Sequence, residues 1–202
     1  MKIYGDKQSG NSYKLILVTS FLQIPYEWQD IDTTKGETRT DSFLQLNPNG
    51  KIPILIWNDG RVLSESNAIL NFLAEGSDLI PKDAFDRARV FQWQFFEQYS
   101  HEPYIAVARY IKHYLGIPEE RRAEYESKQE GGHKALKVLE TQLEKTPFLV
   151  GNSLTTADIS LFAYTHVALE GGFDLSMYPK IQDWIRRIQS LERFMPMHSV
   201  RM

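Results

Sequence analysis

The chain of 202 residues contains no cysteine. This absence excludes structural disulfides, thiolate metal sites and any cysteine nucleophile in the protein itself. No apolar run reaches the ~18 residues of a membrane-spanning helix. The N-terminal stretch MKIYGDKQSG lacks the apolar core of a signal peptide. We therefore expect a cytoplasmic protein.

Metal-binding and nucleotide-binding patterns are also missing from the sequence. None of the five histidines lies in an HExxH motif or in an i, i+4 pair, so we expect no metal site. The chain has no GxGxxG, P-loop or GxSxG motif. Its net charge of −3 does not favour binding to nucleic acid or to an anionic membrane. The length and the 42% hydrophobic content allow one large domain or two small ones.

The first part of the chain alternates predicted strands and helices. A strand–helix–strand start implies a parallel pair of strands, and Asn58-Asp59-Gly60 predicts a hairpin that adds an antiparallel edge. This order predicts a thioredoxin-like α/β domain over residues 1–76, followed by a linker at 77–83. The pattern predicts strands at 2–5, 25–31, 54–57 and 61–63, and helices at 13–21, at 41–46 and from 64–67 onward.

The second part, residues 84–202, is predicted to be all helical. Apolar and aromatic residues recur at helical spacing from Phe85 to Tyr99, and Pro103 is expected to bend this long segment. In the stretch LTTADI, the pattern indicates a helix start at which Thr155 and Asp158 cap each other. Further helices are predicted at 118–145, 156–170 and 179–190.

Residues 46–66, LNPNGKIPILIWNDGRVLSES, have the clearest features of a binding edge. Pro53 cannot donate to a sheet ladder, so we expect it at the start or edge of a strand. Ile52 is then able to offer its N–H and C=O to an extended ligand. The serine-rich helix start at 64–67 has free N–H groups and suits a carboxylate. The polar stretch SGNSYK at 9–14 likewise favours an anion at a helix N-terminus.

Three motifs, NPNGKIP, ESNAI and LTTADI, occur in an order and spacing that span essentially the whole chain. Together they resemble cytosolic glutathione S-transferases, in particular serine-type bacterial members. The resemblance implies that the Ile52–Pro53 bond is cis, that Ile52 pairs with the cysteinyl part of glutathione, and that Glu65 and Ser66 hold its γ-glutamyl end. Glutathione is then the co-substrate, and its ionised thiol attacks a small apolar electrophile.

The resemblance also provides candidates for the group that faces the thiol. Ser9 matches the serine of serine-type members and is the first candidate. Asn11 matches an asparagine of some bacterial members, and Ser12 stands where many relatives have cysteine. The structural alternative is that Ser9 or Ser12 only caps the helix. Because a hydroxyl is too weak a base to take the proton, we expect donation of a hydrogen bond to the thiolate.

Two further subsites follow from the resemblance. Thr38 stands where a histidine is often found after the second strand, so the glycine carboxylate of glutathione would contact Lys51 or Arg39. The electrophile pocket would lie between the loop after the first strand and the long bent helix. Aromatic residues of a helical domain often lie in the core, so core packing is the structural alternative to a pocket role for these candidates. These candidates are Tyr104, Arg109, Tyr110 and His113.

Two alternatives to conjugation stay open. One is glutathione-dependent disulfide reduction, which uses two glutathiones and no protein cysteine, and Asn11 keeps this reading open. The other is a non-catalytic transferase-like scaffold, although the intact ligand edge argues against it. The resemblance also implies a homodimer, with Arg87 and Arg89 as candidates for a polar interface.

Overall fold

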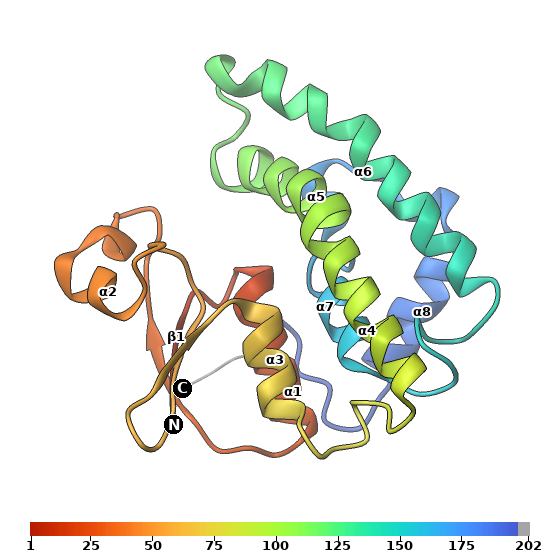
Figure 1. Cartoon of the computed structure of the whole chain (residues 1–202). Coiled ribbons are helices and arrows are strands. Elements are labelled where there is room, and N and C mark those ends of the chain that lie inside the picture. Colours follow the sequence, from red (N-terminus) through yellow and green to blue (C-terminus); the bar gives the residue numbers. More distant parts are fainter. Residues whose placement is uncertain (198–202) are drawn as a thin grey trace. The chain divides into compact units, whose positions relative to one another are not determined.

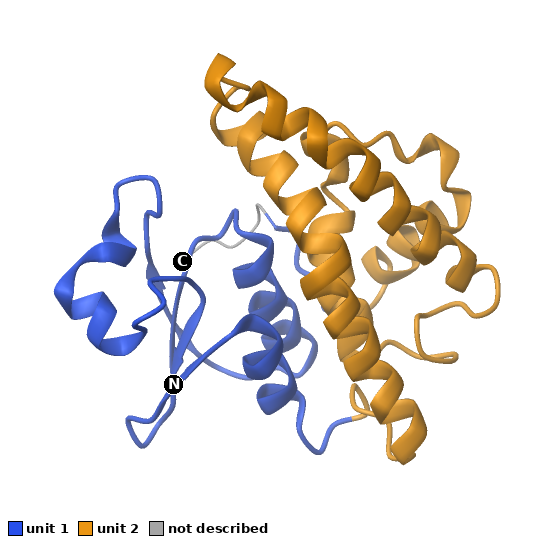
Figure 2. Ribbon diagram, turned by 45° about the horizontal axis from the view of Figure 1, so that its top comes forward, with its two compact units in different colours: residues 1–77, 192–202 blue, residues 78–191 orange. Residues whose placement is uncertain are grey.

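The computed structural model describes residues 1–197, which form two compact units (Figure 2). The first unit holds residues 1–77 and the segment that starts at Glu192, and the second holds residues 78–191. The sequence predicts residues 192–197 to be part of the helical range. Instead, the Tyr13 hydroxyl donates to the Met195 carbonyl at 2.6 Å, and the Ser20 hydroxyl donates to the Arg193 carbonyl at 2.7 Å. These bonds join the segment to the first helix of the first unit.

A four-stranded mixed sheet forms the centre of the first unit, with the strand order β2-β1-β3-β4. β1 and β2 are parallel, with Lys2 opposite Glu27, whereas β3 is antiparallel to both β1 and β4. This topology confirms the predicted thioredoxin-like α/β class. The strands are β1 (Lys2–Gly5), β2 (Glu27–Asp30), β3 (Ile54–Ile56) and β4 (Val62–Ser64).

Helix α1 (Gly10–Phe21) packs against α3 (Ser66–Ala74) in the first unit (Figure 1). The 3-10 turn η1 (Glu37–Arg39) and α2 (Asp41–Leu46) lie between β2 and β3 in the chain. α1 begins at Gly10, earlier than the predicted residue 13. Gly, Asn and Ser are weak helix formers, but the burial of every side chain from residue 12 to 19 outweighs that preference. Asn11 and Ser12 therefore belong to the first helical turn.

The second unit is helical throughout, as predicted. Helical segments follow one another without a break from residue 84 to 114, and a π-helical turn precedes Pro103. A π-helical turn accommodates an irregular hydrogen-bond pattern, which suits a residue that lacks an N–H. The segments are α4 (Ala84–Phe96), η2 (Glu97–His101), α5 (Glu102–Arg109), η3 (Tyr110–Tyr114), η4 (Glu119–Arg121), α6 (Arg122–Leu143), α7 (Thr156–Thr165), η5 (Ala168–Gly171), η6 (Leu175–Met177) and α8 (Pro179–Gln189).

Helix α7 is the centre of the helical unit, because all ten of its residues are buried. The predicted capping box is present at its start: the Thr155 N–H and hydroxyl both donate to Oδ2 of Asp158 at 2.9 Å. The other carboxylate oxygen, Oδ1, accepts the Leu149 N–H and the Trp184 indole N–H, each at 2.9 Å. Asp158 therefore joins α7 to α8 and to the connector after α6, which exceeds the local role predicted from the sequence.

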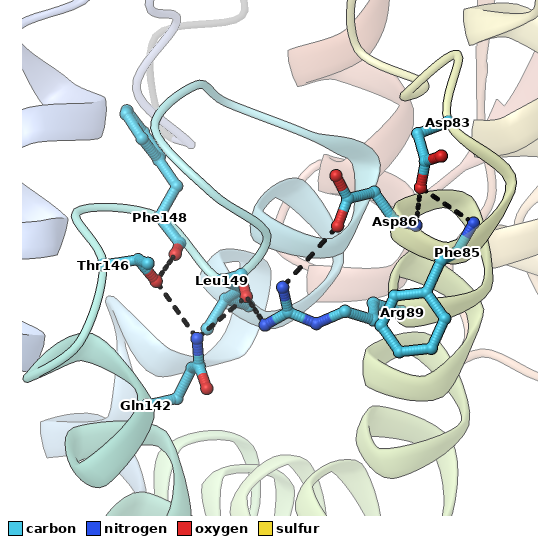
Figure 3. Close-up of polar contacts among 8 residues, drawn as sticks. All are labelled: Asp83, Phe85, Asp86, Arg89, Gln142, Thr146, Phe148 and Leu149. Carbon is cyan, nitrogen blue, oxygen red and sulfur yellow. Dashed lines mark hydrogen bonds and ion pairs between the residues drawn. The ribbon is translucent and has the colours of Figure 1, made fainter.

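The connector around Leu149 is held from two helices (Figure 3). Gln142 of α6 donates to the Leu149 carbonyl at 3.2 Å, and Arg89 of α4 contacts the same oxygen at 3.5 Å. Arg89 also lies 3.7 Å from Asp86. At the start of α4, Asp83 accepts two backbone N–H groups of the first turn. Arg89 thus serves an internal contact of the helical unit.

One face of α4 exposes large aromatic side chains. Tyr99, in the π-helical turn that follows α4, is 79% exposed, and Phe95 is 67% exposed. Phe85 and Phe91 are exposed as well. The aromatic repeat seen in the sequence is therefore a surface stripe on this unit. The buried side of α4 includes Val90 and Trp93.

Candidate functional site

The start of α1 contains the three candidates for the group that faces a thiol. Ser9 is the N-cap residue, but its side chain makes no capping hydrogen bond and is only half-buried. The capping alternative for Ser9 therefore has no support in the geometry. The first turn of α1 contains no acidic residue, so the positive end of the helix dipole is not neutralised there.

Ser12 is placed differently from Ser9. It is fully buried, and its hydroxyl accepts the Asp6 N–H at 3.3 Å. A Cβ added to Gly5 would lie only 2.7 Å from Oγ of Ser12, so α1 and β1 are in close contact at this point. Ser12 joins helix to strand, and a ligand sulfur cannot reach its hydroxyl without a rearrangement.

Asn11 belongs to a hydrogen-bond network that the sequence pattern does not predict. Oδ1 of Asn11 accepts hydrogen bonds from Nζ of Lys14 at 3.0 Å and from Oγ of Ser66 at 3.0 Å. Nζ of Lys14 also donates to Oγ of Ser66 at 3.2 Å. Lys14 is fully buried, although it lies among the apolar side chains of α1. A lysine three residues after Asn11 within an apolar run was the only sequence signal for this network.

Tyr13, two residues after Asn11 in the chain, is not a candidate for contact with the thiol. Its side chain is fully buried, and its hydroxyl donates to the Met195 carbonyl. Burial raises the pKa of the Tyr13 phenol. Its structural bond to the C-terminal segment leaves Ser9 and Asn11 as the accessible polar side chains of this helix start.

The residues of the predicted ligand edge lie directly before β3. The Ile52–Pro53 bond is cis. Within residues 1–197, no hydrogen bond involves the N–H or C=O of Ile52. The preceding turn is held by Asn47, which is buried and donates to the Lys51 carbonyl at 2.8 Å. The backbone groups of Ile52 are therefore available to an extended ligand.

Two exposed cations lie beside this turn. Gly50 has a φ of 62°, and a Cβ added there would lie 2.5 Å from Nη1 of Arg39. The Arg39 guanidinium thus rests against the backbone directly before Lys51. Both side chains are exposed, so both can meet an anion from solvent.

Glu65 and Ser66 lie at the start of α3. Glu65 is exposed and has a φ of 69°, an unusual conformation for a residue with a side chain. Such backbone conformations cluster at ligand-binding sites. Ser66 is buried and contacts Asn11 of α1, so the starts of α1 and α3 meet through these two side chains.

The four pocket candidates of the helical unit differ in accessibility. Tyr104 packs against α6, because a Cβ on Gly131 would lie 2.2 Å from its ring. Arg109 is 2% exposed, and its guanidinium donates to Glu170 at 2.6 Å, so it serves the interior. Tyr110 and His113 are exposed. These two are the candidates that a small molecule can reach directly.

A groove of about 550 Å³ also lies on the helical unit, between α4 and α6. Its lining includes Trp93, Val138 and Lys137, and none of the four candidate residues lines it. Among residues 1–197, no group of three or more His, Cys, Asp or Glu side chains is arranged to hold a metal ion. In the same part of the chain, every helix is too short or too polar to cross a membrane.

Comparison with protein families matches both units. Residues 8–75 match the N-terminal domain of glutathione S-transferases, and residues 95–192 match the C-terminal domain. A glutathione S-transferase of Pseudomonas fluorescens Pf-5 is 59% identical, with a TM-score of 0.96 and 98% of each chain covered. This chain belongs to the glutathione S-transferase family.

Two other relatives indicate how widely glutathione S-transferase-like chains differ in activity. The disulfide-bond oxidoreductase YfcG of Escherichia coli is 29% identical over 187 residues, which cover 89% of this chain and 86% of the relative. A maleylacetoacetate isomerase of Methylobacterium extorquens AM1, crystallised with malonate and glutathione, is 26% identical. Its TM-score is 0.81, with 96% of this chain and 94% of that chain covered. Family membership is therefore consistent with more than one type of reaction.

Proposed function

We propose that this protein binds glutathione along the edge formed by Ile52 and the starts of α1 and α3, and that it activates the thiol for transfer to a small apolar electrophile. The observation that carries the proposal is the contact between Asn11 and Ser66 at 3.0 Å. It brings two helix N-termini, with their N–H donors and positive dipole ends, to one place. Such a place suits the carboxylate and the thiolate of one glutathione molecule.

Each part of glutathione has a partner in this proposal. The backbone of Ile52 pairs with the cysteinyl residue. Glu65 binds the γ-glutamyl ammonium, and the N–H and hydroxyl of Ser66 hold the adjoining carboxylate. The glycine carboxylate meets Arg39 and Lys51, the two exposed cations at the turn. A relative crystallised with glutathione supports this ligand class.

The energies are of the right size for activation of the thiol. A free thiol has a pKa of about 8.5, so lowering this pKa by about two units needs roughly 2.7 kcal/mol of preferential stabilisation of the thiolate. One hydrogen bond to a charged acceptor contributes about 1.5–3 kcal/mol, and a helix N-terminus about 0.3–1 kcal/mol. Donation from Ser9 or Asn11 at the start of α1 therefore suffices.

Calorimetric titration with glutathione tests the binding part of the proposal. The wild-type protein should bind glutathione, and Ser66→Ala should weaken binding about tenfold or more, because charge-assisted bonds to the carboxylate are lost. Ser42→Ala, which changes an exposed serine of α2, should bind like the wild type. Failure of the wild-type protein to bind glutathione would overturn the proposed function.

A second activity, disulfide reduction, is favoured by a specific comparison. A disulfide-bond oxidoreductase is among the relatives, and this chain has no cysteine of its own. The first glutathione thiolate would attack the substrate disulfide, form a mixed disulfide and release one thiol. A second glutathione would then release the other thiol and leave as oxidised glutathione. Comparing the turnover of aryl halides with the turnover of small disulfides, on the same preparation, separates the two activities. Glutathione binding without either activity would indicate a scaffold.

We also propose that the protein is a homodimer, as the family resemblance implies. The exposed aromatic stripe on α4 and η2 supports this more strongly than the Arg87 and Arg89 pair. Arg89 contacts Asp86 and Leu149, and Arg87 reaches the Pro81 and Lys82 carbonyls, so both arginines already serve their own unit. A cytoplasmic location stays a prediction from composition.

A further inference from the structure

A fully buried lysine lies behind the candidate site, and neither binding nor catalysis as described above gives it a role. Lys14 is 0% exposed, and it is flanked in the chain by Tyr13 and Leu15, which are also fully buried. Burial of an ammonium group is costly unless polar partners compensate for its lost hydration. Nζ of Lys14 donates to Oδ1 of Asn11 at 3.0 Å and to Oγ of Ser66 at 3.2 Å.

We propose that Lys14 is a positioning residue that orients the amide of Asn11, so that its Nδ2 donates to the sulfur of glutathione. This inference rests on the proposed function and deepens it, because it selects Asn11 as a donor and explains its orientation.

A lysine ammonium has three donors and no acceptor, so it must face the oxygen of the Asn11 amide and not its nitrogen. The Ser66 hydroxyl accepts from Lys14 and therefore directs its own proton to Oδ1 of Asn11. Two donors thus converge on Oδ1, and the NH₂ end of the amide must point the other way. If Ser66 turns its hydroxyl to a bound carboxylate, Lys14 alone still holds Oδ1.

The NH₂ group that is presented in this way is available. Within residues 1–197, no hydrogen bond involves Nδ2 of Asn11. Asn11 is half-buried and lies in the first turn of α1, where the helix dipole also favours an anion. A flip of the amide would place NH₂ against the ammonium and leave the charge poorly solvated, so the lysine makes the donor orientation the stable one.

A double-mutant cycle on the glutathione-bound protein tests this proposal, with ultraviolet thiolate absorbance against pH as the readout. Asn11→Ala should raise the pKa of the bound thiol by about one to two units, which is ~10- to 100-fold less thiolate at a pH below that pKa. Lys14→Met fills the same buried space without a donor and should produce most of this rise. The double variant should add little to either single change.

Thr19→Val is the matched control. Thr19 is also buried in α1, and its hydroxyl donates to the Leu15 carbonyl, away from Asn11. This variant should leave the thiol pKa at the wild-type value whatever its effect on Tm. If Lys14→Met lowers Tm but leaves the thiol pKa unchanged, the lysine is only structural and the proposal is overturned. Additive effects of the two substitutions would overturn it as well, because they would indicate a direct charge effect.

Asn11→Asp keeps the proposal testable if Lys14→Met does not fold. The carboxylate still accepts from Lys14 and Ser66, so the fold should be retained, but its second oxygen replaces Nδ2 and cannot donate. The thiol pKa should then rise above that of Asn11→Ala, because a carboxylate oxygen faces the thiolate. An equal or lower pKa would contradict the orientation. Glutathione binding by the wild type, measured first, separates failure of this inference from failure of the proposed function.

Discussion

The polar side chains at the start of α1 have different structural roles although they are neighbours in the chain. Ser9 is accessible and makes no capping bond, whereas Ser12 is buried against β1. Asn11 faces Lys14 and Ser66 through its oxygen. The sequence SGNSYK does not show which residue has which role, because Ser, Gly and Asn are all common at helix starts. Burial and partner atoms do distinguish them.

At the residue scale, Ser9→Ala should raise the pKa of glutathione-bound thiol by about one unit, because one hydrogen bond to the thiolate is lost. Tm should change little, since the Ser9 hydroxyl makes no capping bond. Affinity at about pH 6 should also change little, because the thiol is mostly protonated there. A titration that coincides with that of the wild type would assign the donation to Asn11 alone.

At the scale of elements, the start of α7 shows how a local motif acquires a tertiary role. A capping box alone contributes about 0.5–2 kcal/mol. Asp158, however, also accepts the Leu149 N–H and the Trp184 indole N–H in the interior. Loss of its carboxylate leaves these buried donors without their acceptor, at about 1–3 kcal/mol each. The residue therefore stabilises three elements of the helical unit.

Asp158→Ala should accordingly destabilise the protein by roughly 3–5 kcal/mol, a fall in Tm on the order of 10 °C for a chain of this length. Asp158→Asn should also be strongly destabilising, because each carboxylate oxygen accepts two donors and an amide nitrogen accepts none. Asp83→Ala is the control, since it removes an exposed cap of α4 and should cost only the capping value. Equal losses for Asp83→Ala and Asp158→Ala in thermal unfolding would contradict the tertiary role.

The same carboxylate predicts a pH dependence of stability. Burial raises the pKa of Asp158 from its ordinary 3.8, although the four donors oppose this rise. In the window between 3.8 and the raised pKa, the folded state binds more protons than the unfolded state, so stability falls as pH rises. The difference in Tm between the wild type and Asp158→Ala should therefore shrink with increasing pH across this window. A difference that grows would show the opposite shift of the pKa.

At the scale of the whole molecule, the exposed aromatic stripe predicts assembly with a second copy. Phe85, Phe91, Phe95 and Tyr99 leave an apolar face on the helical unit, and such faces mark interaction sites. Light scattering at micromolar concentration should give about twice the 23.5 kDa of one chain, with at least ~1,200 Å² buried in the dimer. A mass of one chain would contradict the homodimer.

Phe95→Asp tests whether this stripe is the interface. It should produce a monomer, because a charge would be buried against apolar partners. Met177→Asp, at another exposed apolar residue of the same unit, should stay dimeric. A dimeric Phe95→Asp protein would place the interface elsewhere.

Much of this protein follows from its sequence alone, for local reasons. The order of strands and helices, the hairpin at Asn58-Asp59-Gly60 and the capping box at Thr155 and Asp158 each depend on residues that are close in the chain. The cis bond before Pro53, by contrast, is expected only from the family resemblance. Helical periodicity does not distinguish a face buried in the core from an exposed interaction face. The exposure of Phe95 could therefore be determined only from the structure.

The tertiary structure decided the contacts between residues that are far apart in the chain. Lys14 meets Ser66 across 52 positions, Tyr13 meets Met195 across 182, and Trp184 meets Asp158 across 26. The chemistry of a polar side chain determines which hydrogen bonds it can form. Tertiary packing decides which partner lies near it once water is excluded. For that reason the sequence suggested a thiol site at the start of α1, and the fold determined how Asn11 is oriented within it.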